Sequence, residues 1–138
     1  MIAFVNTIVF VKDIEKSKTF YTDVLGLKIT QDSGTIVFFE NHFVIHNTRS
    51  IATTVFGKVK QQNETLQGRE NLLVYFETDD LEESYQKVSG SGCKIIHPIK
   101  KQEWGQNVFR FYDPDGHILE IGEAMHYKFD QGKIYEAI

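Results

Sequence analysis

The clearest alternation of apolar and polar positions lies near the end of the chain, over residues 107–123. β-Branched and aromatic residues flank the sequence Asp-Pro-Asp-Gly at 113–116, which is typical of a tight turn between two strands. Alternation along the second strand places Glu120 on the face opposite to Leu119 and Ile121. The pattern therefore predicts a hairpin whose second strand carries one carboxylate among apolar neighbours.

Similar patterns occur in the first half of the chain. Residues 6–11 favour a strand, and Asp13 can cap the helix that the spacing of apolar positions predicts from Ile14 to Leu25. Gly26 is suited to end that helix in a left-handed conformation. Further strands are expected over residues 27–30, 35–40 and 43–46, whereas residues 51–56 fit either a short helix or a strand.

The second half repeats this order. Residues 72–76 favour a strand, and Asp80 is placed to cap a helix with Glu83 at the third position, as in a capping box. A Gly-Ser-Gly sequence at 90–92 ends the helix. A strand at 94–96 and a loop over 98–106 then lead to the hairpin.

The order strand, helix, strand, strand, strand thus occurs twice, and one offset aligns Asp13 with Asp80 and Ile14 with Leu81. Each copy is too small to cover its own sheet face, so two copies must pair, within the chain or between chains. The predicted fold is α+β: two βαβββ modules forming a curved eight-stranded mixed sheet, with a concave cleft and helices on the convex side. In this single domain over 1–138, module one spans about 1–58, a polar connection about 59–70, module two about 71–123 and a C-terminal tail 124–138.

Composition narrows the classes of protein and partner. A chain of 138 residues with 41% hydrophobic residues fits one domain, and a net charge of −4 argues against a nucleic-acid partner, which needs a clustered positive field. Cys93 is the only cysteine, so no intrachain disulfide is expected. The first residues carry no basic leader, and no apolar run approaches the ~20 residues that span a membrane. We therefore expect a cytoplasmic protein with no membrane partner.

Two stretches resemble motifs of a known superfamily. They are Phe-Tyr-Thr-Asp-Val-Leu-Gly-Leu at 20–27 and Phe-Tyr-Asp-Pro-Asp-Gly-His-Ile-Leu-Glu at 111–120. Both resemble the vicinal oxygen chelate superfamily, which includes glyoxalase I, bleomycin-resistance proteins, fosfomycin-resistance enzymes and extradiol dioxygenases. The resemblance covers about residues 4–123. It implies paired βαβββ modules, a homodimer and a small-molecule ligand in a cleft.

Enzymes of this superfamily hold a divalent metal on four equivalent strand positions, where several donors converge and leave room for substrate. Carried over by resemblance, those positions are Asn6, His46, Leu73 and Glu120. Leu73 has no donor atom and Asn6 is a short neutral amide, so only His46 and Glu120 remain as good ligands. We therefore expect no catalytic metal, with zinc, nickel, manganese or iron on His46, Glu120 and Asn6 as the alternative.

Other candidate residues have more than one interpretation. His46 is a ligand, a general base or a hydrogen-bonding residue of the cleft, and the motif places Glu120 in the cleft. Arg110 is an anion holder or an exposed strand arginine. Trp104 stacks on a planar ligand or closes the end of the core. Surface positions are expected for four histidines: His42, His97, His117 and His126.

Three functions remain open on these grounds. The first is a homodimeric protein of the bleomycin-resistance type that binds a small molecule in an aromatic cleft without a metal. The second is a metal-dependent lyase or isomerase of the glyoxalase type with an altered ligand set. The third is a metal-free proton-transfer enzyme that uses Glu120 as its base. The apolar tail is expected to pack on a partner or over the cleft.

Overall fold

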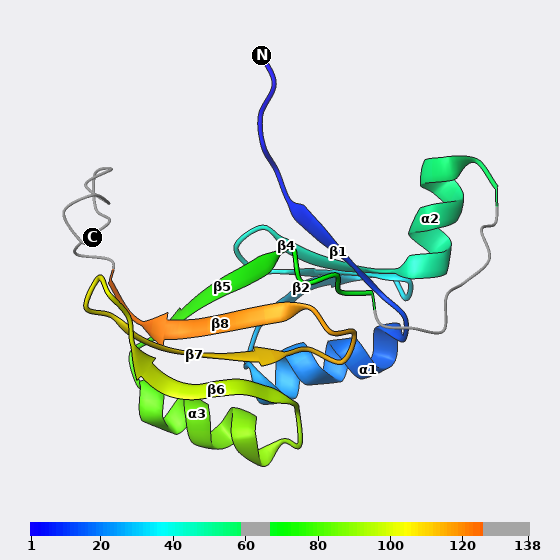
Figure 1. Cartoon of the computed structure of the whole chain (residues 1–138). Helices are drawn as coiled ribbons and strands as arrows, with labels where there is room; N and C mark the ends of the chain where they lie inside the picture. The colour runs from blue at the N-terminus through cyan, green and yellow to red at the C-terminus, as the bar shows by residue number, and fades with distance from the viewer. Residues whose placement is uncertain (59–66, 126–138) are drawn as a thin grey trace. The chain divides into compact units, whose positions relative to one another are not determined.

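A computed structural model of the chain describes residues 1–58 and 67–125. The chain divides into two compact units, Met1–Arg69 and Glu70–Ile138, and each is described by itself (Figure 1). Residues 126–138, which include most of the C-terminal tail whose packing was predicted and the predicted surface residue His126, lie outside the described residues. No helix in the described ranges is long and apolar enough to cross a membrane.

Unit 1 contains one four-stranded sheet with the strand order β1-β4-β3-β2. Its first strand runs parallel to β4, and the other neighbours are antiparallel. Residues 51–56 are helical, and the strand expected at 27–30 begins two residues later. The elements are β1 (Thr7–Val11), α1 (Ile14–Thr19), a π-helical turn η1 (Phe20–Val24), β2 (Ile29–Asp32), β3 (Ile36–Phe39), β4 (Phe43–Asn47) and α2 (Thr48–Phe56).

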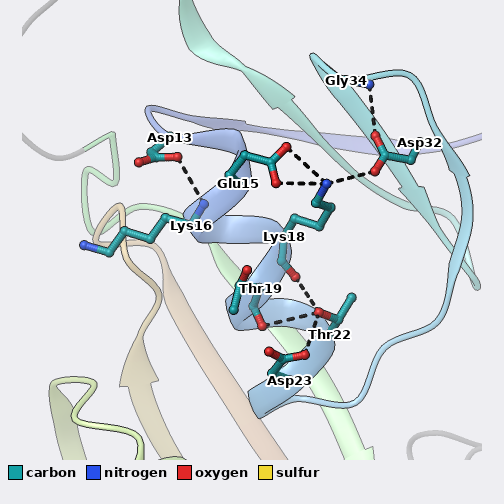
Figure 2. A network of polar contacts seen from close by, with 9 residues as sticks. All are labelled: Asp13, Glu15, Lys16, Lys18, Thr19, Thr22, Asp23, Asp32 and Gly34. Atoms are coloured by element: carbon teal, nitrogen blue, oxygen red, sulfur yellow. Dashed lines mark hydrogen bonds and ion pairs between the residues drawn. The ribbon is translucent and has the colours of Figure 1, made fainter.

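The start of α1 follows from local chemistry. The Asp13 side chain accepts a hydrogen bond from the backbone N–H of Lys16 at 3.1 Å, as a helix N-cap does. Figure 2 shows Lys18 reaching from the same helix to Glu15 and to Asp32 at the end of β2, with ion-pair distances of 3.0 Å for both. The hydrogen bond to Asp32 is the main reason why the pKa of Lys18 is raised. Lys18 therefore links helix α1 to strand β2 through an ion pair.

Unit 2 repeats the order of elements, and its strands lie in the order β5-β8-β7-β6. The predicted loop over 98–106 is wrong in its first part, because β6 continues through Pro98 to Lys101. Proline is tolerated there because β6 is the edge strand and its register on β7 shifts on both sides of His97. The elements are β5 (Leu73–Thr78), α3 (Leu81–Gly90), β6 (Ile95–Lys101), β7 (Asn107–Tyr112) and β8 (Ile118–Glu123).

Helix α3 covers one face of the unit 2 sheet (Figure 1). The Tyr85 ring on α3 meets Phe109 edge-on at 5.1 Å, and Phe109 stacks on Phe111 at 5.4 Å. Leu119 and Ile121 pair with these two phenylalanines and are buried with them. The face opposite α3 is therefore the one that carries Glu120, as the alternation predicts.

The α+β class and the two βαβββ modules are confirmed. The single eight-stranded sheet is not confirmed, because the structure has two four-stranded sheets. Strands belong to one sheet only if hydrogen bonds join them in ladders. The repeat in the sequence predicts the strands of each module, but it does not predict which strands pair.

A substitution at the N-cap of α3 tests whether Asp80 stabilises the start of this helix. The Asp80 carboxylate accepts a hydrogen bond from the backbone N–H of Glu83 at 3.0 Å. We expect Asp80→Ala to lower the free energy of unfolding by about 1 kcal/mol, since one backbone donor loses its partner. The matched control Asp79→Ala should change it by less than about 0.5 kcal/mol. Urea denaturation measures both, and equal effects would contradict the capping role.

Candidate functional site

Four side chains lie in a row across the sheet face opposite α3, one from each strand of unit 2. The register places Tyr75 of β5 beside Glu120 of β8, Glu120 beside Arg110 of β7, and Arg110 beside His97 of β6. Side chains opposite one another on one face of a sheet are close enough to interact. We call these four residues the polar row.

The centre of the polar row is an ion pair. Arg110 Nε lies 2.6 Å from Glu120 Oε1, and the two side chains are 24% and 8% exposed. A carboxylate this deeply buried would be costly without a partner, and a charge-assisted hydrogen bond to guanidinium compensates for it. The pair is formally neutral, which explains how an acidic residue stands among apolar strand neighbours.

The other two nitrogens of the guanidinium group are also engaged. One contacts His97 Nε2 at 3.1 Å, and the other donates to Gln102 Oε1 at 3.3 Å. His97 Nδ1 lies 2.7 Å from the carbonyl oxygen of Pro98. These contacts fit a neutral ring that donates through Nδ1 and accepts the arginine proton at Nε2. Arg110 is thus held on three sides in a fixed orientation.

A second network meets the polar row at Tyr75 and is centred on Gln106, which is only 2% exposed. The Gln106 amide nitrogen donates to the Tyr75 hydroxyl at 2.8 Å and to the backbone carbonyl of Glu123 at 2.9 Å. Its amide oxygen accepts the indole N–H of Trp104 at 2.8 Å. Gln106 therefore fixes an aromatic side chain on each side of it.

The Tyr75 hydroxyl donates its own proton to Glu77 at 2.5 Å. Desolvation raises the pKa of Tyr75 far above its usual value, and the hydrogen bond to Glu77 adds to this effect. Tyr75 is consequently a neutral phenol at physiological pH. Its side chain contributes a ring, and 41% of the residue's surface remains exposed.

Gly122 makes room for Gln106. A Cβ atom at Gly122 would lie 2.4 Å from the amide nitrogen of Gln106 and 3.1 Å from a methyl group of Val108, its partner across the ladder. Only a residue without a side chain allows the buried amide to lie directly over the strand.

Two of the positions carried over by resemblance, Asn6 and His46, belong to unit 1. Asn6 is half-buried just before β1, and His46 on β4 pairs with Phe10 and Ile36. His46 Nδ1 is buried without a hydrogen-bond partner among the described residues, and burial lowers the pKa of this imidazole. His46 is therefore a neutral side chain in an apolar setting.

The row in unit 1 that corresponds to the polar row is different in character. With Asp13 aligned to Asp80, Tyr75 corresponds to Ile8, and the ladders continue from Ile8 through Val44 and Phe38 to Gln31. His46 lies two residues beyond Val44. The ladder thus places Val44, rather than His46, at the position that corresponds to Glu120.

Leu73 begins β5 and is 41% exposed, and it pairs with Ile118. The ladder puts Tyr75, two residues further along, directly beside Glu120. The residues around Glu120 do not fit a divalent metal, because its closest charged partner is the Arg110 cation. Over residues 1–58 and 67–125, no three His, Cys, Asp or Glu side chains are grouped as a metal site would require.

Several residues of the site were not predicted. His97 was expected at the surface but is half-buried against Arg110, and His117 is half-buried against Asp113 at 2.8 Å. His42 is exposed, as expected. Alternation from Ile95, which pairs with Phe111, would have placed His97 on the α3 face. The register shift between Ile95 and His97 is what brings His97 beside Arg110. Gln106 follows a glycine in a loop, and no sequence pattern indicated that it belongs to the site.

The close fit of Gln106 over Gly122 predicts the effect of one added methyl group. We expect Gly122→Ala to displace the Gln106 amide, to lower the free energy of unfolding by about 1–3 kcal/mol, and to change the fluorescence of Trp104, the only tryptophan of the chain. Gly90→Ala is the control, because a Cβ there meets nothing within 4 Å. An unchanged emission spectrum in Gly122→Ala would show that Gln106 does not hold the indole.

Comparison with known proteins agrees with this architecture. The sequence model of the Glyoxalase-like domain matches residues 4–126. YraH of Bacillus subtilis (strain 168) is 29% identical over 116 residues, which cover 80% of this chain and 90% of that protein.

Solved structures show the same fold. A protein of unknown function from Agrobacterium tumefaciens strain C58 is 46% identical, with a TM-score of 0.84 over 91% of this chain and 96% of that one. Lactoylglutathione lyase from Agrobacterium tumefaciens is 21% identical, with a TM-score of 0.66 over 88% and 93%. A glyoxalase-related enzyme from Fulvimarina pelagi is 19% identical, with a TM-score of 0.71 over 90% and 89%. At such identities the last two show the fold alone. The chain belongs to the Glyoxalase-like domain family, in agreement with the vicinal oxygen chelate superfamily that its motifs resemble.

Proposed function

We propose that this protein binds a small organic molecule on the polar row of unit 2 and does so without a catalytic metal. The observation that carries the proposal is the 2.6 Å contact between Arg110 and Glu120. At the strand position where the resemblance implies a metal ligand, the carboxylate already has a cation beside it. A divalent metal on the same carboxylate would face electrostatic repulsion from the guanidinium group.

The neighbouring aromatic side chains suit a ligand with a planar part. Trp104 is half-buried and held by Gln106, and the Tyr75 ring is partly exposed beside Glu120. Aromatic side chains offer a large apolar contact area, and here hydrogen bonds at their polar ends fix both orientations. Such fixed groups lose little conformational entropy when a ligand binds.

A metal-dependent lyase or isomerase of the glyoxalase type would need further donors around Glu120. On the same face its ladder neighbours are Tyr75, whose proton is committed to Glu77, and Arg110, which has no acceptor atom. Neither supplies a normal ligand for zinc or nickel. The metal-free binding function therefore has better support.

Metal content tests the proposal directly. We expect protein prepared without chelators to contain far less than one nickel, zinc, manganese or iron ion per chain. Adding each ion should leave the melting temperature unchanged, because a ligand stabilises a protein only if it binds the native state. Mass spectrometry of the metals and thermal melts measure these quantities. Near-stoichiometric metal that disappears in Glu120→Gln, but persists in the exposed control Glu103→Gln, would show that the alternative is right.

We also propose a homodimer. β1 and β5 each end a sheet in their unit, and exposed apolar residues lie at these edges: Ile8, Leu72 and Leu73, at 43%, 55% and 41% exposure. Unpaired edge strands with apolar side chains favour association with another chain.

Sedimentation tests the dimer. We expect the wild-type protein to sediment as a dimer, and Ile8→Lys or Leu72→Lys to increase the monomer fraction, because a charge at an apolar contact is costly. Val55→Lys on α2, at a position 58% exposed, is the matched control and should remain dimeric. A wild-type monomer at all concentrations would rule the homodimer out.

A further inference from the structure

Glu120 has one carboxylate oxygen that the rest of the described chain does not satisfy. Oε1 accepts the hydrogen bond from Arg110, whereas no described residue donates to Oε2. The residue as a whole is only 6% exposed, but Oε2 is not among the fully buried side-chain atoms that lack a partner in the described residues, which are His46 Nδ1 and Thr48 Oγ1. A carboxylate oxygen that has no protein donor and remains accessible is an acceptor that a ligand can use.

The side chains beside Glu120 make their hydrogen bonds elsewhere. The Tyr75 hydroxyl gives its proton to Glu77, and Gln106 gives its amide protons to Tyr75 and to the Glu123 carbonyl. Arg110 uses its guanidinium group for Glu120 Oε1, His97 and Gln102, and none of these contacts reaches Oε2. Water or a ligand can therefore supply the donor for Oε2.

We propose that Glu120 Oε2 is a specificity-determining group that selects aromatic ligands carrying a hydrogen-bond donor, with an amine preferred over a hydroxyl and a carboxylate rejected. This inference rests on the proposed metal-free binding function and adds the class of ligand. The donor binds Oε2, and the aromatic part lies against the exposed portion of the Tyr75 ring.

The order of preference follows from charge. A protonated amine forms a charge-assisted hydrogen bond to a carboxylate, and this is stronger than the bond from a neutral hydroxyl. A carboxylate ligand has no proton to donate to Oε2. The charges of Arg110 and Glu120 offset each other, and Glu77 beside Tyr75 leaves one negative charge on this face, which favours an ammonium group over a second carboxylate.

Three probes on one benzyl frame test the inference: benzylamine, benzyl alcohol and phenylacetate. Each is titrated into the metal-free full-length protein while the indole N–H resonance of Trp104 is followed by NMR. Trp104 is the only tryptophan of the chain and reports on Tyr75 through Gln106. We expect benzylamine to bind most tightly, benzyl alcohol more weakly, and phenylacetate not at all.

The variants assign this preference to one residue. Glu120→Gln should weaken benzylamine binding by roughly tenfold or more, since the charge-assisted bond is lost. Glu103→Gln removes a carboxylate beside Trp104 at an exposed position and should leave binding unchanged. The ranking of the three probes by affinity is measured on the wild-type protein. It therefore tests the ligand class even if Glu120→Gln does not fold.

Three results would overturn the inference: phenylacetate binding as tightly as benzylamine, no response to any probe, or unchanged benzylamine affinity in Glu120→Gln. Metal analysis of the same sample separates this failure from failure of the proposed function. Metal-free protein that prefers phenylacetate contradicts only the ligand class. Stoichiometric metal on Glu120 contradicts the proposed function itself.

Discussion

The register of β7 against β8 is the constraint on which the site depends, and the turn between the strands sets it. The buried Asp113 carboxylate accepts the backbone N–H groups of Asp115 and His117 at 2.8 and 2.9 Å, and it contacts the His117 ring at 2.8 Å. A slip of one residue would move every side chain of a strand to the other face. By fixing the turn, Asp113 brings Arg110 opposite Glu120.

The ion pair that results constrains both the stability and the chemistry of unit 2. Breaking a buried pair by removing one partner leaves an uncompensated charge, which is far more costly than the pair is stabilising. Arg110 is therefore needed because Glu120 is present, and the contacts from His97 and Gln102 hold it in place. The same arrangement leaves Glu120 Oε2 without a hydrogen-bond donor among the described residues. The side chains around this oxygen are already held in place by hydrogen bonds. A ligand that binds there would lose little free energy to ordering them, which favours selective binding.

Much of this arrangement follows from sequence patterns with a local physical cause. Alternation places Glu120 opposite Leu119 and Ile121, and Asp13 and Asp80 cap their helices as expected. The continuation of β6 past Pro98 was not predicted, because proline ordinarily argues against a strand. The position of Gln106 over Gly122 depends on a contact between distant residues that no periodicity encodes. The position of a side chain was thus predictable where its neighbours in the sequence determine it. It was not predictable where contacts between distant residues determine it.

The two modules differ in a way that supports unit 2 as the place of the proposed ligand recognition. Both bury an apolar strand pattern and both start their helices with an aspartate cap, so the repeat is maintained where the fold requires it. On the opposite face, unit 1 has Ile8, Val44 and Phe38 where unit 2 has Tyr75, Glu120 and Arg110. The three apolar side chains offer a ligand area but no hydrogen bond, and hydrogen bonds are what discriminate one polar group from another. We therefore assign the proposed choice between ligands of similar size to the polar row.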